Sequence, residues 1–246
     1  MKKEGLERKS GYGNVYGQQS GLTRAMLEVS GIRKRYGRKI VLDGVSFQAE
    51  CGERVAVIGR NGCGKTTLMQ ILAGVMKPDG GSLRYFGNDP QGRREYFHKY
   101  CGYVPQELPL MEELSVRDNL RLWGVGRLRD SAELIREFQL EELMKTTVSK
   151  LSGGMKRRLC IACALSGRQP ILLMDEPTTA LDLYYKDVIG AFMKQYCAKN
   201  GIIVMTTHDE REILSCDRCL LMQEGHLAEL AKEERGMDSI RKILAG

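Results

Sequence analysis

The sequence predicts an α/β fold with a largely parallel sheet, and two patterns carry this prediction. Short apolar runs recur along the chain, and helical stretches follow several of them. Apolar runs without polar alternation are typical of strands that helices cover on both faces. The expected strands are residues 55–58, 171–174, 202–205 and 220–222. The expected helices are residues 65–73, 183–198 and 210–214.

Two parts of the chain depart from this alternation. An antiparallel β layer is expected at the edge of the sheet, from the segments near residues 27–29, 45–49 and 82–86. Between residues 117 and 165 the pattern becomes helical, and Ser115 and Ser131 are candidate N-caps ahead of apolar residues at helical spacing. We therefore expect a small helical subdomain, about residues 107–165, inserted into the α/β core.

Size and composition are those of a compact, well-solvated domain. The chain has 246 residues, of which 42% are hydrophobic and 28% are charged. Residues 1–25 show no clear period and are expected to be a flexible extension, so the folded domain should comprise residues 26–246. Because about 20 residues follow Gly225 in this sequence, no regulatory domain is expected.

No segment is apolar enough to cross a bilayer. The longest unbroken apolar run, residues 159–165, has seven residues, whereas a spanning helix needs roughly 20. No apolar stretch follows Lys2 and Lys3, so the start of the chain is not a secretory signal. We expect a cytoplasmic protein, which another chain would have to hold at a membrane.

The charge gives little support for nucleic-acid binding. The formal net charge is +7, and residues 1–25 carry five cations against two acids, which is +3. The rest of the chain therefore carries only +4, and a solvated face is the simpler interpretation. No nucleic-acid partner is expected.

Eight cysteines are expected to be reduced thiols, because no secretory signal is present. Cys160 and Cys163, and likewise Cys216 and Cys219, have C-x-x-C spacing, which leaves a zinc site open as an alternative. The first pair lies in a strongly helical, apolar stretch. Buried small side chains are the plainer interpretation there.

A glycine-rich loop follows the expected strand at 55–58 and opens the expected helix at 65–73. Residues 59–66 read Gly-Arg-Asn-Gly-Cys-Gly-Lys-Thr and fit G-x-x-x-x-G-K-[ST], the phosphate loop of P-loop NTPases. The glycines let backbone N–H groups approach phosphate oxygens, and the helix N-terminus adds its positive dipole end. Lys65 should reach the β- and γ-phosphates, and the Thr66 hydroxyl should ligate Mg²⁺. The residues expected to bind ATP here are Gly59, Arg60, Asn61, Gly62, Cys63, Gly64, Lys65, Thr66 and Thr67.

Two acids follow the buried strand at 171–174, at the end where parallel α/β sheets bind ligands. Asp175 is expected to hold Mg²⁺ directly or through water. Glu176 is expected to polarise the attacking water as a general base. The fold class is therefore a P-loop NTPase core that binds ATP with Mg²⁺.

Residues 151–155, Leu-Ser-Gly-Gly-Met, resemble the signature of ATP-binding-cassette (ABC) transporter ATPases. Further family landmarks occur in the same order, and the resemblance covers about residues 26–230. These are Tyr36 at the adenine-stacking position, Gln106 at the Q-loop, residues 180–182 (Ala-Leu-Asp) at the D-loop and His208 at the switch histidine.

The resemblance implies a role for each landmark. Gln106 would reach Mg²⁺ and link the site to the helical subdomain, and His208 would contact the γ-phosphate. With Lys65 and Glu176, these two residues make up the expected catalytic set. Tyr36 could instead be a half-buried surface aromatic, Gln106 a solvated loop residue and His208 part of a helix cap.

The resemblance also implies that the chain works as a pair. Ser152, Gly153 and Gly154 would expose backbone amides at a helix N-terminus, yet the family's helical subdomain points away from the chain's own phosphate loop. The signature would thus close over ATP held by a second copy, and Asp182 would act across the same interface. A homodimer is expected.

One residue departs from the family pattern. The signature usually ends in Gln, and Met155, which stands here instead, cannot form the same hydrogen bonds. The phosphate contacts would come from the residues before it, so we expect activity to survive. A module that binds ATP but barely hydrolyses it is the alternative that Met155 favours.

The function expected from this resemblance is that of an ATP-hydrolysing subunit on the inner face of the cell membrane, attached to a transmembrane permease. The permease would dock near residues 107–114, and residues 155–158 resemble cassettes that serve exporters, so export is expected. An importer subunit is an alternative. A cassette that acts on ribosomes or DNA is another, although the chain lacks the second cassette or long insertion typical of that group.

Overall fold

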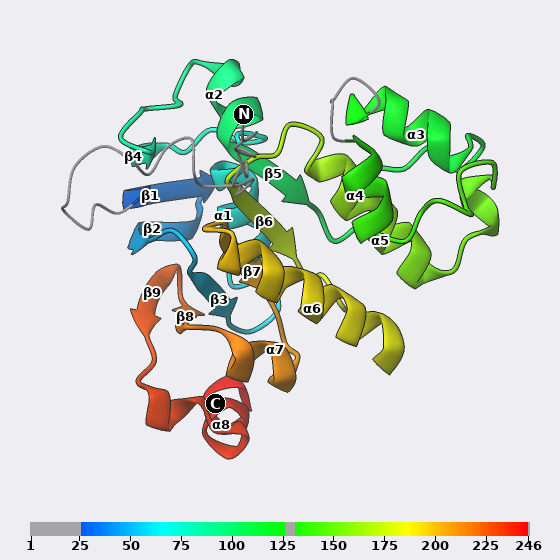
Figure 1. Ribbon diagram of the computed structural model, residues 1–246. Helices are drawn as coiled ribbons and strands as arrows, with labels where there is room; N and C mark the ends of the chain where they lie inside the picture. Colours follow the sequence, from blue (N-terminus) through cyan, green and yellow to red (C-terminus); the bar gives the residue numbers. More distant parts are fainter. Residues whose placement is uncertain (1–25, 126–130, 246) are drawn as a thin grey trace, which may run out of the picture.

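The computed structural model describes residues 26–125 and 131–245. Its centre is a six-stranded sheet with the order β5-β6-β7-β3-β8-β9 (Figure 1). The first five strands are mutually parallel, and β9 pairs antiparallel with β8. These strands are β5 (Cys101–Val104), β6 (Ile171–Asp175), β7 (Ile202–Thr206), β3 (Arg54–Ile58), β8 (Arg218–Gln223) and β9 (His226–Glu229). The predicted parallel sheet is confirmed.

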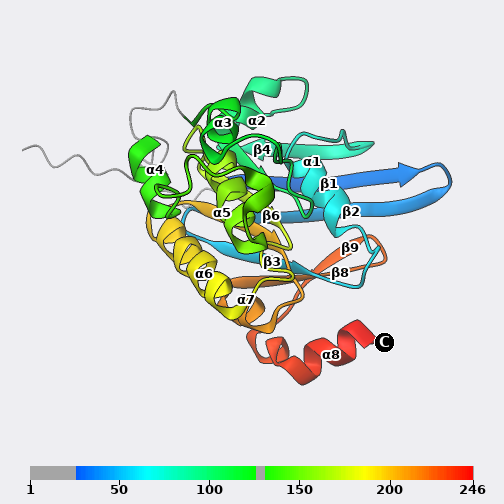
Figure 2. The ribbon, with the colours of Figure 1, turned by 90° about the vertical axis from the view of Figure 1, so that its right-hand side faces the viewer.

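A second, antiparallel sheet has the order β2-β1-β4 and covers one side of the core. Its strands are β1 (Leu27–Tyr36), β2 (Lys39–Ala49) and β4 (Gly80–Tyr85). The hairpin of β1 and β2 extends well beyond the rest of the layer in the turned view (Figure 2). The predicted antiparallel layer is therefore confirmed, and β1 continues as far as Tyr36, further than the sequence pattern indicates.

Two apolar cores lie on the two faces of the six-stranded sheet, as the alternation of side chains along each strand requires. Val55 and Val57 point into the core shared with helix α1 (Lys65–Leu72) and the antiparallel sheet. Ala56 and Ile58 point into the core on the opposite face. Helices on that face are α6 (Leu183–Ala198), α7 (Glu210–Ser215) and α5 (Gly153–Ala164).

The helical lobe lies beside the core and contains α3 (Val116–Leu122), α4 (Ser131–Glu137), the 3₁₀ turn η2 (Val148–Lys150) and α5 (Figure 1). Ser115 caps α3, because its Oγ accepts a hydrogen bond from Asp118 N, as the sequence predicts. Helix α4 begins at Ser131 itself, and the residue before it lies outside the described part of the chain. The predicted bounds of the helical subdomain, and the predicted extension at residues 1–25, stay predictions.

Several short elements are absent from the sequence expectation. They are α2 (Arg94–Tyr100), strands β5 and β9, the 3₁₀ turn η3 (Lys232–Arg235) and α8 (Met237–Ala245). Within residues 26–125 and 131–245, no helix combines the length and hydropathy needed to span a membrane.

The cysteines of this part of the chain are free thiols. Cys160 and Cys163 are buried in α5, as expected for small core residues. Across the described segments, no cluster of three or more His, Cys, Asp or Glu side chains has the arrangement of a metal site.

Candidate functional site

The phosphate loop lies between β3 and α1, as the sequence predicts. Helix α1 begins directly after Gly64, which has no side chain to cap the first turn, and no acidic residue lies in that turn. The first N–H groups of the helix are therefore not satisfied by a capping side chain of the chain itself. Together with the helix dipole, they provide a place for an anionic group.

Two glycines of this loop are required by close contact. A Cβ atom at Gly59 would lie 2.4 Å from the carbonyl oxygen of Met222, a backbone atom of the neighbouring strand β8. At Gly64, where φ is +114°, a Cβ atom would lie 2.9 Å from the carbonyl oxygen of Val41. The loop therefore packs against the backbone of two other strands, which fixes its shape.

Lys65 is buried at the first position of α1 and points back into the loop. Its Nζ donates hydrogen bonds to the carbonyl oxygens of Gly59 at 2.7 Å and Arg60 at 3.1 Å. The ammonium group is thus held inside the phosphate loop by the residues that shape it. A cation in this position is suited to neutralising a triphosphate that the loop amides bind.

The two acids occupy different environments at the end of β6. Asp175 is buried, and one of its oxygens, Oδ1, accepts a hydrogen bond from the hydroxyl of Thr206 on the adjacent strand β7. Glu176 follows with a φ of +49°, a left-handed conformation that is uncommon for a residue with a side chain. Its backbone N donates to both the carbonyl and the hydroxyl oxygen of Thr206, which holds this conformation in place.

Two predicted catalytic residues, Gln106 and His208, converge on the Glu176 carboxylate, and Thr179 joins them. Gln106 Nε2 lies 3.3 Å from Oε2 and donates to it, and Thr179 donates to the same oxygen at 3.0 Å. His208 Nε2 lies 3.5 Å from Oε1. Burial and the positive charge of Lys65 lower the pKa of His208, while Glu176 opposes this shift. Near neutral pH the imidazole is therefore uncharged.

A cleft of about 460 Å³ joins the phosphate loop to these catalytic side chains. Its lining comprises Tyr36, Val41, Asn61, Gly62, Gly64, Lys65, Thr66, Thr67, Gln106, Glu176 and His208. Tyr36 is half exposed at the end of β1 and its hydroxyl contacts Met76 Sδ, so a flat face of the ring is available at the rim. Gly59, Arg60, Cys63 and Asp175 do not line it.

A magnesium ion fits the chemistry of Asp175, at the end of β6, and of Thr66, in the cleft lining. Asp175 Oδ2 is buried and has no hydrogen-bond partner in the described part of the chain. An unpaired buried carboxylate oxygen is costly unless a cation or a water satisfies it. Thr66 contributes a hydroxyl to the cleft lining, and hard oxygen ligands are what Mg²⁺ prefers.

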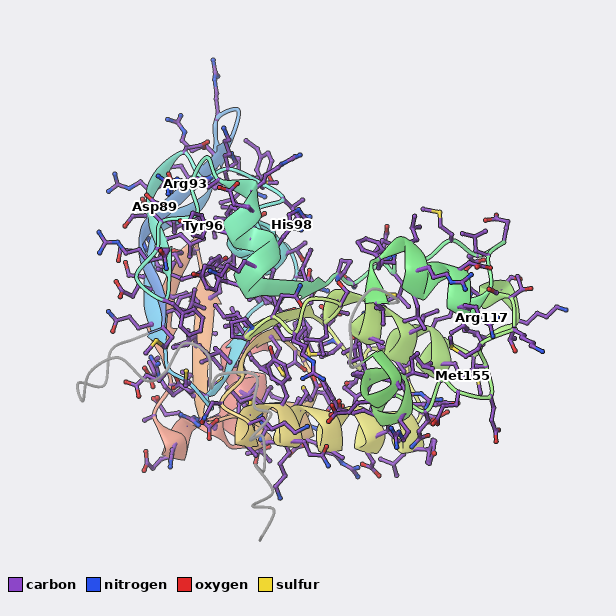
Figure 3. All side chains as sticks on the ribbon, turned by 45° about the horizontal axis from the view of Figure 1, so that its top comes forward. Asp89, Arg93, Tyr96, His98, Arg117 and Met155 are labelled. Carbon is purple, nitrogen blue, oxygen red and sulfur yellow. The ribbon has the colours of Figure 1, made fainter. Side chains whose placement is uncertain are left out.

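The signature residues lie outside this cleft. Ser152 caps α5 by accepting a hydrogen bond from Met155 N at 3.3 Å, and Met155 lies in the helical lobe (Figure 3). Asp182 caps α6 by accepting from Tyr185 N at 3.0 Å. None of Ser152, Gly153, Gly154 and Asp182 lines the cleft. The structure therefore brings the phosphate loop, Gln106, Glu176 and His208 together, and leaves the signature and the D-loop outside this group.

Two alternatives from the sequence, for His208 and for Gln106, can now be compared with the geometry. The N-cap of α7 is Asp209, whose Oδ1 accepts from two backbone N–H groups, so His208 is free to face the cleft. Gln106 is exposed but contacts Glu176. Sequence reasoning missed Thr179, Val41 and Thr206 at the site.

A phosphate loop after a central parallel strand, with paired acids two strands away, defines a nucleotide-hydrolysing P-loop domain. The ABC transporter family model matches residues 42–179. The chain belongs to this family, in which it is an ATPase subunit coupled to transport.

Relatives of known name support this assignment over most of the chain. The chain is 35% identical over 218 residues to Nod factor export ATP-binding protein I of Rhizobium sp. (strain N33). This match covers 85% of this chain and 71% of that protein. It is 37% identical over 185 residues to the cytochrome c biogenesis ATP-binding export protein CcmA of Bradyrhizobium diazoefficiens, covering 72% of this chain and 91% of the relative.

Solved structures show the same architecture. The structure of an ATP-binding subunit of an ABC transporter matches with a TM-score of 0.78 at 29% identity, over 90% of this chain and all of that one. A dimeric ATP-binding cassette in a post-hydrolysis state, bound to ADP and Pi, matches with a TM-score of 0.75 at 24% identity, over 84% of this chain and 99% of the other. The second likeness concerns the fold alone.

Proposed function

We propose that this chain drives an export transporter by hydrolysing ATP between two identical copies of itself. The direction of transport is inferred from the relatives, since the named ones with 35% and 37% identity are export ATP-binding proteins. The observation that carries the pairing is the separation within one chain of the cleft, which gathers Gln106, Glu176 and His208, from the signature at the start of α5.

In this proposal the chain's own residues divide the work between binding and chemistry. Tyr36 stacks on the adenine ring, and the amides of residues 59–66, with Lys65, hold the triphosphate. Thr66, Gln106 and Asp175 hold magnesium, which when bound neutralises charge on the phosphates. Arg60, Asn61, Cys63 and Thr67 complete the loop and its immediate surroundings.

Glu176 is the proposed general base. Gln106 and Thr179 donate to its carboxylate and His208 lies beside it, and these contacts orient it toward a water molecule that attacks the γ-phosphate. His208, neutral near pH 7, contributes an N–H that stabilises charge on the phosphate oxygens. Both groups reach into the same cleft from strand ends of a rigid sheet, so their spacing does not depend on the helical lobe.

The facing copy completes the site. Ser152, Gly153 and Gly154 lie at the N-terminus of α5, and Ser152 and Gly153 are exposed. Their amides would cap the γ-phosphate held by the other copy, with Asp182 beside them. Loss of the γ-phosphate would remove this bridge and let the copies separate, and the helical lobe would transmit the movement to a transmembrane permease.

ATP-dependent pairing tests the proposal directly. The Glu176→Gln variant should bind ATP with Mg²⁺, lose turnover and form a stable dimer, measured by light scattering after size-exclusion chromatography. Wild-type protein with ATP should dimerise only transiently. Equal ATPase rates for wild type and Glu176→Gln would refute the role of Glu176, and a Glu176→Gln protein that stays monomeric with ATP would refute the pairing.

The attachment to a membrane is tested separately. We propose that the chain is cytoplasmic and peripheral to the inner face of the cell membrane, held there by its permease. Tagged protein expressed in its native cells should sediment with membranes and release one transmembrane chain on solubilisation. Sedimentation with ribosomes or DNA would instead favour a cassette that does not transport.

A further inference from the structure

Tyr185 covers the signature turn, which we define as residues 152–154. A Cβ atom at Gly154 would lie 2.2 Å from Cδ2 and Cγ of the Tyr185 ring, so the ring rests directly on the glycine backbone. The guanidinium carbon of Arg158 lies 5.3 Å from the ring centroid. Because positions 154 and 158 are four residues apart, they present one face of α5 to this ring.

Tyr185 also belongs to the element that carries the D-loop aspartate. It lies in the first turn of α6, and its backbone N donates to Asp182 Oδ1 at 3.0 Å. Ser152 Oγ donates to the Tyr185 hydroxyl over a long distance of 3.4 Å. One residue therefore contacts both Asp182 and the signature turn, which are the two parts of the chain proposed to face the neighbouring copy.

The ring is held in place by a cation that is itself fixed. Arg158 is buried, and its Nη1 donates to the carbonyl oxygen of Phe138 at 2.9 Å and to Gln139 Oε1 at 3.0 Å. The guanidinium cannot follow a displaced ring without breaking these bonds. Tyr185 is thus packed onto Gly154 with Arg158 beside it, and the contact joins the helical lobe to the start of α6.

We propose that Tyr185 is a positioning residue that fixes the signature turn relative to Asp182, so that both meet the second copy as one unit. This inference rests on the proposed pairing of two copies. Met155 supplies no hydrogen-bonding side chain after the turn, which leaves the ring of Tyr185 as the main side-chain support against it. The tyrosine acts through Ser152 and Gly154, whose groups would contact the phosphate.

The test compares Tyr185→Ala, which removes the ring, with Tyr185→Phe, which keeps it. Both are made in the Glu176→Gln background, and the ATP concentration for half-maximal dimerisation is measured. We expect Tyr185→Ala to raise this concentration by about tenfold and Tyr185→Phe by less than about threefold, because the hydroxyl contact is long. Tyr184→Ala is the matched control, since Tyr184 is exposed and stacks edge-on against Tyr185. The ATP concentration for half-maximal dimerisation of Tyr184→Ala should stay within about threefold of that of the Glu176→Gln background.

A second measurement separates positioning from general damage. Binding of a fluorescent ATP analogue to the dilute monomer should be the same in all these variants, because the phosphate loop belongs to a different part of the chain. Reduced monomer binding in Tyr185→Ala, or dimerisation equal to that of the background, would overturn the inference. If Tyr185→Ala does not fold, Tyr185→Leu is measured in the same way. This variant keeps apolar bulk without a flat ring, so the same two outcomes test the role of Tyr185.

The proposed pairing of two copies and the proposed role of Tyr185 can be refuted independently. If Glu176→Gln alone does not dimerise with ATP, the proposed function is wrong. If it dimerises and Tyr185→Ala in the same background dimerises equally well, only the role of Tyr185 is wrong.

Discussion

The hydroxyl of Thr179 donates a 3.0 Å hydrogen bond to Glu176 Oε2, three residues earlier in the chain. Gln106 donates to the same oxygen, while His208 lies nearest the other one. Each carboxylate oxygen therefore has a neighbour that restricts its rotation. A general base that is held in one orientation aligns its water more often than one that rotates freely.

Replacing Thr179 by valine should slow hydrolysis without weakening ATP binding. Valine keeps the shape and removes the donor, so Glu176 loses one of its orienting contacts. We expect kcat to fall by about threefold to tenfold with KM for ATP nearly unchanged, as measured by steady-state phosphate release. Thr179→Ser, which retains the hydroxyl, is the control. A Thr179→Val protein as active as wild type would show that this contact is dispensable.

His208 should make stability depend on pH. Its pKa is lowered first by burial and then by the charge of Lys65, so the folded protein binds this proton less readily than the unfolded chain does. Neutral His208 makes its full contribution to the free energy of unfolding above the ordinary histidine pKa of about 6.5. This contribution is lost as the pH falls through the lower pKa of the folded state. The effect is modest because the side chain is 36% exposed.

The comparison that isolates this effect is between wild type and His208→Gln. From about pH 7.5 to pH 5, the Tm of wild type should fall further than that of His208→Gln, measured by differential scanning fluorimetry without nucleotide. His226→Gln, at a histidine that is 65% exposed, is the control for removing an imidazole outside the cleft lining. Parallel curves for wild type and His208→Gln would contradict the lowered pKa.

Asp175→Asn should weaken the response to magnesium. The asparagine amide oxygen can still accept from Thr206, so the strand end should keep its fold, while the charge at the unpaired Oδ2 is lost. Wild-type protein should bind ATP more tightly with Mg²⁺ than with EDTA. The ratio of these two affinities should be smaller by about tenfold or more in the variant. Equilibrium binding of a fluorescent ATP analogue measures both conditions.

Asp217→Asn is the matched control for this experiment. Asp217 accepts from Arg54 N at the start of β3, the end of the sheet opposite the cleft. Its variant should keep the wild-type response to magnesium. An Asp175→Asn protein that responds to magnesium as wild type does would remove Asp175 from the proposed ligand set.

Gly64→Ala should weaken nucleotide binding with little change elsewhere. The added Cβ would lie 2.9 Å from the backbone oxygen of Val41, and φ at this position is +114°, so the loop must shift. We expect affinity for ATP to fall by about tenfold or more, measured by isothermal titration calorimetry. Gly190→Ala is the control, because its site in α6 has open space and an ordinary helical backbone. It should bind normally and gain about 0.5–1 kcal/mol of stability.

Short, wholly apolar runs and the phosphate loop made the core predictable from sequence. Strands β6 and β7 are wholly buried, and both coincide with expected apolar segments. Helix α2 was missed because its seven residues are mostly charged or aromatic and only Tyr100 is buried. Strand β5 was missed because it has four residues and includes a glycine, too few to form a pattern.

The contacts at the site were harder to predict than its principal residues. Glu176 and Asp175 follow an apolar strand, which identifies them, but the hydroxyl of Thr206 that contacts both comes from 30 residues further along the chain. Tyr185 and Gly154 are likewise 31 positions apart on separate helices. Such pairs depend on the packing of two elements, and neither helical nor strand periodicity contains that information.

Strand β7 lies between β6 and β3 in the sheet, so one strand separates the two acids from the phosphate loop. With strands about 4.8 Å apart, the gap between them is set by two rows of backbone hydrogen bonds. The spacing between the acids and the phosphate loop is therefore fixed by the central sheet and not by the helical lobe. Substitutions confined to that lobe should leave this distance unchanged.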